Sequence, residues 1–385
     1  MTVTGPKGFR AAGVAAGIKQ GALDLALVVN DGPDQAAAGV FTRNVIKAAP
    51  VLWSQEVLRH QRLKAVVLNS GGANAATGPG GFQDTHATAE KAAEVLGTGA
   101  IDVAVCSTGL IGERLPMTAV LSGVDSAYHA LADTPEAGLD AATAIMTTDT
   151  KPKQVWKHHA AGWGIGGIAK GAGMLAPNLA TMLSVLTTDA VIEPDALDAA
   201  LRAATRVTFD RLDVDGGTST NDTVLLLSSG ASGTAPGLDE FTELLAAACL
   251  DLVLQLRADS EGATKDIDVV VRGAASEQDA INVGRTIAED NLVKTALFGS
   301  DPNWGRVAMA VGRAQAEIDP GTLSIAINGV TLFAAGSTAE DRSKADLTGR
   351  AIEIVVDLGV GSSTATIYTT DLSHGYVEEN SAYSS

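Results

Sequence analysis

The change from a glycine-rich loop to an apolar strand at Thr181 is the feature that most constrains this chain. The segment Lys170–Ala190 reads KGAGMLAPNLATMLSVLTTDA. Gly171, Gly173 and Pro177 are incompatible with a regular helix in its first half. From Thr181 onward, the run of Thr, Met, Leu, Ser, Val, Leu and Thr predicts a buried strand. The loop therefore delivers a hydroxyl-bearing residue to the start of a rigid strand.

The position of Thr181 suits a chain that cleaves itself. Its hydroxyl can attack the carbonyl carbon of Ala180 to give an ester, which water then opens to leave Thr181 as a new N-terminus. An α-amine has an ordinary pKa of about 7.7–8.0, so it is a usable general base beside the hydroxyl at neutral pH. The local alternative is an ordinary glycine-rich loop that enters a core strand, and the residues alone favour this simpler interpretation.

Composition restricts the class of protein and of partner. The 385 residues suffice for two or three packed units, and 46% hydrophobic residues is normal for a globular protein. A formal net charge of −18 argues against nucleic acid and against an anionic membrane surface as partners. Cys106 and Cys249 are too few for a disulfide framework, and the N-terminus lacks the long apolar stretch of a signal peptide. We therefore expect a cytoplasmic enzyme.

Alternating strands and helices predict a mixed α/β protein. Strands are expected at 24–30, 38–41, 64–70, 102–107, 155–168, from 181 onward, and at 223–229, 267–271, 323–327 and 352–356. Helices are expected at 83–96, 116–131, 136–146, 193–207, 238–257 and 276–296.

A second turn with a hydroxyl group follows the expected strand at 102–107. Ser107, Thr108 and Gly109 leave this strand and enter a loop, where backbone amides can be free. Gly109 also lets a ligand approach closely, because it has no Cβ. Donors of this kind stabilise the oxyanion that forms when a nucleophile attacks a carbonyl group. The same pattern also fits a plain exit from a strand into a turn.

Three other positions carry polar or charged groups that could bind a substrate. Thr147 lies in a run of hydroxyl residues at the end of an expected helix, which could equally cap that helix. Lys170 can pair with a carboxylate, although a single lysine is most often solvated. Glu261 can bind an amino group, although it could equally be a surface residue near a helix end.

Several motifs resemble the ornithine acetyltransferase family of arginine biosynthesis, also called bifunctional glutamate N-acetyltransferase. KGAGMLAPNLATML is similar to the self-cleavage site of that family, and VCSTGLIGERLPM resembles its oxyanion-hole segment. NSGGANA, DPNWGR, DVDGGTSTNDT and the C-terminal YVEENSAYSS also match. The chain departs from the family pattern at Gly217, where the resemblance leads us to expect Asp. It also departs at Glu379 and Ser381, where smaller or more apolar residues are expected.

The resemblance implies a role for each candidate residue. Thr181 is the nucleophile, and cleavage after Ala180 divides the chain into residues 1–180 and 181–385. Thr108 and Gly109 form the oxyanion hole. The residues implied to bind substrate are Thr147, Lys170, Thr181, Glu261, Asn380 and Ser385.

The resemblance also implies the fold, the reaction and the partners. The expected fold is α/β (α+β), a layered helix–sheet–sheet–helix sandwich with a smaller C-terminal α/β subdomain at about 275–385. The expected reaction moves an acetyl group from N2-acetylornithine to glutamate through acetyl-Thr181, and acetyl-CoA is an open further donor. The cut chains are expected to form a heterotetramer of two α and two β chains, with no cofactor and no metal.

Two apparent motifs carry no function in this interpretation. Gly162–Gly167 fits the glycine pattern of dinucleotide-binding loops, but no helix follows it. His158 and His159 point to opposite faces of an expected strand, and no further ligands stand at metal-binding spacing.

Two other functions stay open on the residues. One is a self-processing amidohydrolase or aminopeptidase of similar fold, in which water accepts the acyl group. The other is a non-catalytic binding protein that keeps the loop uncut. An acyl-enzyme that survives until an amine arrives distinguishes transfer from hydrolysis, and a single uncut chain would indicate the binding protein.

Overall fold

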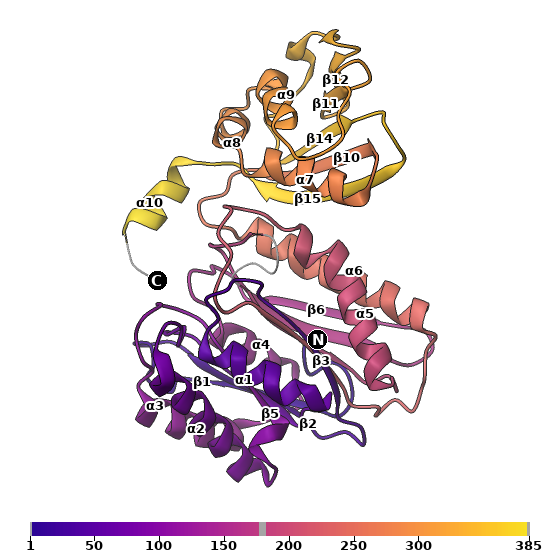
Figure 1. Ribbon diagram of the computed structural model, residues 1–385. Coiled ribbons are helices and arrows are strands. Elements are labelled where there is room, and N and C mark those ends of the chain that lie inside the picture. The colour runs from indigo at the N-terminus through magenta and orange to yellow at the C-terminus, as the bar shows by residue number, and fades with distance from the viewer. Residues whose placement is uncertain (1, 177–181, 383–385) are drawn as a thin grey trace. The chain divides into compact units, whose positions relative to one another are not determined.

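A computed structural model describes residues 2–176 and 182–382 and divides the chain into two units (Figure 1). The first unit comprises Met1–Asp210 and Thr218–Leu256, and the second comprises Arg211–Gly217 and Arg257–Ser384. The predicted division of the chain at Ala180–Thr181 lies outside the described residues. Within the described ranges, no helix has both the length and the apolar character needed to cross a bilayer.

Two sheets form the centre of the first unit. In the described residues, one sheet has four strands in the order β1-β2-β4-β5, and the other has five in the order β3-β9-β8-β7-β6. The strands of the first sheet are β1 (Phe9–Val14), β2 (Leu25–Asn30), β4 (Ala65–Asn69) and β5 (Val103–Ser107). Those of the second are β3 (Ala36–Phe41), β6 (Lys153–His158), β7 (Gly164–Lys170), β8 (Leu183–Thr188) and β9 (Thr223–Ser228).

Helices cover the outer face of each sheet and complete four layers (Figure 1). The helices of this unit are α1 (Ala49–Val57), α2 (Gly78–Leu96), α3 (Met117–Ala130), α4 (Pro135–Ala144), α5 (Pro194–Val207) and α6 (Leu238–Ala258). Side chains such as Leu68 and Val185 fill the space between the sheets. Leu27 points to the opposite face of its strand and packs with Val124 of α3. The predicted helix–sheet–sheet–helix sandwich is therefore confirmed.

The local sequence explains why these elements form. β2 reads LALVVN and is buried at every position, as expected of a strand covered on both faces. α5 begins with a proline in its first turn, carries Asp195 near its N-terminus and Arg206 near its C-terminus, and buries an apolar stripe that includes Leu197 and Leu201. Gln255 of α6 donates to the carbonyl of Gln154 in β6 at 3.0 Å, which links this helix to that strand.

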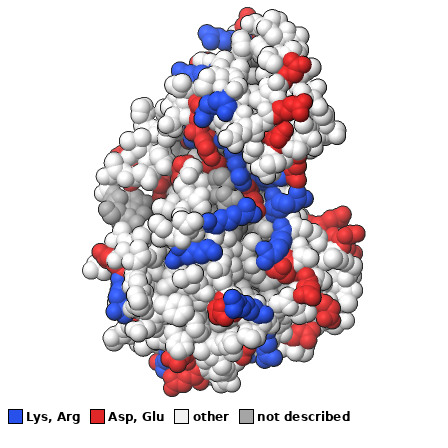
Figure 2. Space-filling view, viewed as in Figure 1, with Lys and Arg blue, Asp and Glu red and all other residues white. Residues whose placement is uncertain are grey.

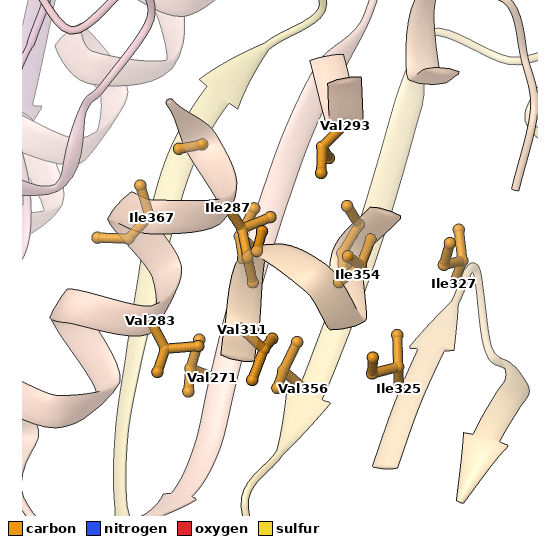
Figure 3. Packing of buried hydrophobic residues seen from close by; sticks show 14 of the residues in the cluster. Val271, Val283, Ile287, Val293, Val311, Ile325, Ile327, Ile354, Val356 and Ile367 are labelled. Carbon is orange, nitrogen blue, oxygen red and sulfur yellow. The ribbon is translucent and has the colours of Figure 1, made fainter. Parts of the chain in front are cut away.

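The second unit has one sheet with helices packed on one face (Figure 3). Within the described residues, its strand order is β13-β12-β11-β14-β10-β15. Val283 and Ile287 of α7 and Val311 of α9 face Val271 and Ile354 of the sheet (Figure 3). The strands are β10 (Asp266–Ala274), β11 (Ser324–Ile327), β12 (Val330–Ala334), β13 (Ser337–Thr338), β14 (Ala351–Asp357) and β15 (Ser363–Thr370). The helices are α7 (Glu277–Ala288), α8 (Asn291–Phe298), α9 (Trp304–Gly312) and α10 (His374–Ala382).

Two predicted elements are wrong in their continuity. The single strand expected at 155–168 is a hairpin of β6 and β7, closed by the bond from the His159 amide to the Trp163 carbonyl at 2.8 Å. Gly162 permits this turn because its φ is 91°. The single helix expected at 276–296 is divided into α7 and α8. Asp290 causes the division, because its side chain accepts hydrogen bonds from the amides of Leu292 and Val293 and caps α8.

The surface is charged without a single dominant sign on the face shown in Figure 2, where acidic and basic side chains are interspersed. Exposed pairs such as Arg202–Asp198 at 2.7 Å belong to this surface. Pairs of this kind contribute little to stability, because water screens them. The stability of each unit therefore rests mainly on its apolar core.

Gly13 gives a direct test of the packing of α4 against β1. A Cβ at Gly13 would lie 2.1 Å from the backbone oxygen of Asp140. Gly13→Ala should therefore lower the free energy of unfolding by about 1–3 kcal/mol in urea titrations. Gly99→Ala is the matched control, because a Cβ there would lie 3.5 Å from Ile101 Cγ2, and it should change the free energy by less than about 0.5 kcal/mol. Equal effects of the two substitutions would contradict this packing.

Candidate active site

The ends of two parallel strands bring two polar loops together in the first unit. β4 and β5 pair in parallel, with Asn69 opposite Ser107. Their carboxyl ends therefore lie at the same edge of the sheet, where binding residues of α/β proteins commonly gather. The amide of Gly72 donates to the carbonyl of Thr108 at 3.0 Å, and the hydroxyl of Ser107 donates to Asn69 Oδ1 at 2.6 Å.

Thr108 and Gly109, the predicted oxyanion-hole residues, lie in this region. The amide of Thr108 is not available, since it donates to the carbonyl of Asn69 at 3.0 Å. The hydroxyl of Thr108 is therefore the group that it can offer. The Gly109 amide donates no hydrogen bond within the described part of the chain. Gly109 has a φ of 131°, and a Cβ there would lie 2.5 Å from the amide nitrogen of Gly72, so only glycine fits.

Asn221 joins this edge to the loop that precedes β9. Its Nδ2 donates to the carbonyl of Ser107 at 2.8 Å and to the carbonyl of Ala73 at 2.6 Å. One buried amide thus ties three segments that are far apart in the sequence. The run Asp213–Thr223, to which the sequence assigned no role, supplies this tie.

Lys170 and Thr147 lie in the same unit as Thr108. Lys170 ends β7, is 2% exposed, and its Nζ donates to Thr108 Oγ1 at 3.2 Å. Thr147 is half-buried and follows α4, where its amide donates to Asp149 Oδ2 at 3.0 Å. Asp149 also accepts a hydrogen bond from the amide of Gly171, which directly follows Lys170, at 2.6 Å. Asp149 therefore links the positions of two predicted substrate-binding residues.

Asp222 is a buried carboxyl group beside the first described residue after the loop. Its Oδ1 accepts a hydrogen bond from the amide of Met182 at 3.1 Å, and its Oδ2 has no partner within the described ranges. Burial raises the pKa of Asp222 well above its usual range, against the lowering effects of the Met182 amide, the Lys170 charge and Ser219. Burial therefore favours the protonated form of this carboxyl group.

Glu261 and Asn380 come together in the second unit. Asn380 Nδ2 donates to Glu261 Oε2 at 2.8 Å, so α10 carries one predicted residue onto the other. A Cβ at Gly262 would lie 2.1 Å from the amide nitrogen of Tyr376, and the φ of Gly262 is 60°. Burial, with the charges of Asp215 and Glu261, raises the pKa of Tyr376 to about 12.

A cavity of about 300 Å³ lies next to Tyr376 in this unit. Asp215, Lys294 and Asp371 contribute charged groups to its wall. Lys294 donates to Thr369 Oγ1 at 3.2 Å, and its burial lowers its pKa to about 8 against the opposing charges of Asp213, Asp215 and Asp371. The charged groups of the cavity wall are therefore mainly acidic, with one buried amine, and Val214, Leu372 and Val377 add apolar surface.

Ala180, Thr181 and Ser385 lie outside the described residues. Their roles, like those of Thr108, Gly109, Thr147, Lys170, Glu261 and Asn380, stay predictions. The sequence reasoning missed Asp149 and Asp222 as parts of this site. Asp149 could have been noticed as the one acid in the run Thr147–Thr150, and Asp222 as an acid directly before an apolar strand.

The described residues contain no group of three or more His, Cys, Asp and Glu side chains placed to hold a metal ion. His159 is engaged elsewhere, since its ring stacks on Trp163 at 4.9 Å between centroids and its Nε2 lies 3.1 Å from Glu240. Both cysteines are buried free thiols, and burial raises the pKa of each to about 12.

Comparison with known proteins identifies the class of enzyme. The chain matches the ArgJ family over residues 10–385. It is 62% identical over 389 residues to the arginine biosynthesis bifunctional protein ArgJ of Mycolicibacterium paratuberculosis, with 100% of this chain and 96% of that protein covered. The protein of the same name from Streptomyces coelicolor is 61% identical over 388 residues, with 100% of both chains covered. The chain therefore belongs to the ArgJ family, and the resemblance found in the sequence is confirmed.

One solved structure is also similar in part. It is the complex of ornithine acetyltransferase from Mycobacterium tuberculosis with ornithine. It is 64% identical to this chain, covers 47% of this chain and 96% of its own, and has a TM-score of 0.46.

The protonation state of Asp222 predicts a pH dependence of stability. Its pKa is raised in the folded state relative to the unfolded value near 3.9, so folding is favoured most at low pH. This contribution falls as pH rises from the unfolded pKa toward the folded pKa, by up to about 1.4 kcal/mol per pH unit. Urea titrations between pH 5 and pH 8 should show Asp222→Asn gaining stability relative to the wild type as pH rises. A constant difference across this range would contradict the raised pKa of Asp222.

Proposed function

We propose that the protein is a self-cleaving acetyltransferase that moves an acetyl group from N2-acetylornithine to glutamate through an acetyl-Thr181 intermediate. Membership of the ArgJ family, whose curated relatives are named for arginine biosynthesis, supports this function. The observation that carries it is the arrangement of Lys170 on Thr108 beside the amide of Gly109, which donates no hydrogen bond within the described residues. These groups offer donors for an oxyanion at the edge of the sheet.

Cleavage creates the nucleophile. The Thr181 hydroxyl oxygen attacks the carbonyl carbon of Ala180, and the C–N bond breaks as the ester bond forms. The nitrogen takes up the proton that the hydroxyl loses. Water then opens the ester, which leaves a carboxylate on Ala180 and a free α-amine on Thr181. The new α-amine is attached to Cα, and the hydroxyl is attached to the adjacent Cβ. The amine can therefore act as the base that takes the proton of this hydroxyl.

Acetyl transfer follows in two half-reactions. The α-amine takes the hydroxyl proton while Thr181 Oγ1 attacks the acetyl carbon of N2-acetylornithine. The Thr108 hydroxyl and the Gly109 amide donate to the developing oxyanion. The ammonium then protonates the departing nitrogen, and ornithine leaves. The amine of glutamate attacks the acetyl ester in the second half-reaction, returns the hydroxyl to Thr181 and leaves as N-acetylglutamate.

The remaining predicted residues bind the substrates. Lys170 supplies positive charge for a carboxylate, and Glu261 supplies negative charge for an amine. Thr147, Asn380 and Ser385 contribute polar contacts. We also propose acetyl-CoA as a second donor, an assembly of two α and two β chains, and a cytoplasmic location.

Intact-mass measurement tests the cleavage. The purified wild-type chain should give two fragments, the second beginning at Thr181. Thr181→Ala should stay as one chain without transferase activity, because it has no hydroxyl to attack. Thr181→Ser is the matched control, since it keeps the hydroxyl, and it should be cut. A wild-type chain that is fully active while uncut would exclude this mechanism.

Initial-rate kinetics separate transfer from hydrolysis. A covalent intermediate makes the two substrates use one site in turn, so double-reciprocal plots for N2-acetylornithine at several glutamate concentrations should be parallel. N2-acetylornithine alone should add one acetyl group to the fragment that begins at Thr181, and glutamate should remove it. Intersecting plots without a trapped adduct would indicate direct transfer. Acetate release that is independent of glutamate would indicate an amidohydrolase.

A further inference from the structure

Asp149 occupies a turn between α4 and β6 and connects three segments of the first unit. Its side chain is 0% exposed. Oδ1 accepts from Lys153 Nζ and from the Gly171 amide, each at 2.6 Å, and Oδ2 accepts from the Thr147 amide at 3.0 Å. Both carboxylate oxygens are therefore occupied by donors from separate elements, which fixes the orientation of the group.

Asp149 is ionised despite its burial. Burial by itself would raise the pKa of this carboxyl, but the charges of Lys170 and Lys153 and the Gly171 amide outweigh it and hold the pKa below its usual range. Lys153 is equally enclosed, with 2% of its side chain exposed. One buried carboxylate thus interacts with the charges of two buried lysines, Lys153 and Lys170.

Lys170 extends this arrangement to the predicted oxyanion hole. Its Nζ donates to Thr108 Oγ1 at 3.2 Å. Because the Thr108 oxygen accepts this bond, its own proton is free to point toward a substrate. The positive charge on Lys170 also strengthens the hydroxyl as a donor, because both residues are buried.

We propose that Asp149 is a positioning residue for acetyl transfer, which holds the Lys170 ammonium on the Thr108 hydroxyl and fixes Thr147 and Gly171 through their backbone amides. This role rests on the proposed acetyltransferase function. Asp149 need not touch substrate. It acts through residues that are themselves expected to do so.

Three other titratable groups lie around Asp149 and Lys170. Lys153 comes from β6, and Lys19 lies in the loop after β1, where its Nζ donates to the carbonyl of Met146 at 2.8 Å. Desolvation lowers the pKa of Lys19, opposed by the charges of Asp24 and Asp149. Asp222 lies in the loop before β9, where the charge of Lys170 acts on it, and burial raises its pKa well above the usual range. Asp149 pairs directly with Lys153 at 2.6 Å, and the charge of Lys170 also acts on it.

The test is the pH dependence of kcat/KM for N2-acetylornithine in the full-length, self-cleaved protein. Asp149→Asn keeps the shape of the side chain but removes the counter-ion, so Lys170 should lose its proton at a lower pH. The alkaline limb of the profile should move down by about 1–3 pH units, and kcat should fall at least about tenfold at pH 8. A purely structural ion pair would lower stability and leave this limb in place.

Asp189→Asn is the matched control. Asp189 is a buried acid that accepts from the Gly164 amide at 2.9 Å, at the opposite end of β7, and from the Lys7 amide at 3.1 Å. Asp189→Asn removes one negative charge from the same unit, as Asp149→Asn does. The pH profile of this variant should keep the alkaline limb of the wild type. Coinciding limbs for wild type, Asp149→Asn and Asp189→Asn would overturn the proposal.

Lys153→Gln keeps the proposal testable where Asp149→Asn does not fold or cleave. It removes the competing lysine, so Lys170 should hold its proton to a higher pH and the alkaline limb should move upward. An unmoved limb would again overturn the role of Asp149. A wild-type protein without acetyl transfer would instead overturn the proposed function, so the two failures are distinguishable.

Discussion

The buried charge balance at Asp149 is the interaction on which the arrangement of the first unit's site depends. Breaking a buried ion pair by removing one partner typically costs ~3–5 kcal/mol, whereas replacing the pair by apolar residues of similar volume is often neutral. Stability alone therefore does not require the Asp149–Lys153 pair. Its distinctive consequence is geometric, because the same carboxylate holds the amides of Thr147 and Gly171. These charges therefore contribute mainly to the positions of Thr147 and Gly171, rather than to the stability of the fold.

Much of the order of strands and helices followed from periodicity, although α1 and α9 were not expected from the sequence. β2 is a continuous apolar run and α5 has a clear polar face, so both were predicted. The errors arose where one local pattern continued through a break. The pattern of 155–168 continues through the turn at Gly162, and the helical spacing of 276–296 continues through the capping residue Asp290. The pairing of β4 with β5 at one edge could not be predicted, because it depends on contacts between distant strands.

The candidate site was predictable only where its residues are neighbours in the chain. Thr108 and Gly109 stand together in one motif, and glycine at 109 is explained by the close approach of Gly72. The links between motifs were missed. Asn221 reaches Ser107 and Ala73 across more than a hundred residues, and Asp149 reaches Gly171 across the hairpin of β6 and β7. A sequence pattern records residue types, but it does not record which buried donor meets which acceptor after folding.

Two buried carboxyl groups near Lys170 show how one local environment can shift pKa values in opposite directions. The pKa of Asp222 is raised by burial, and the pKa of Asp149 is lowered although its burial acts in the same direction as that of Asp222. The difference lies in their partners, since Asp149 has Lys153 at 2.6 Å in addition to the charge of Lys170, whereas Asp222 has the Met182 amide at 3.1 Å. Groups whose pKa values are driven apart in this way can divide the tasks of holding charge and holding a proton. Asp149 provides a fixed anion beside Lys153, and Asp222 provides a carboxyl group whose burial favours the protonated form at the residue that follows the predicted nucleophile.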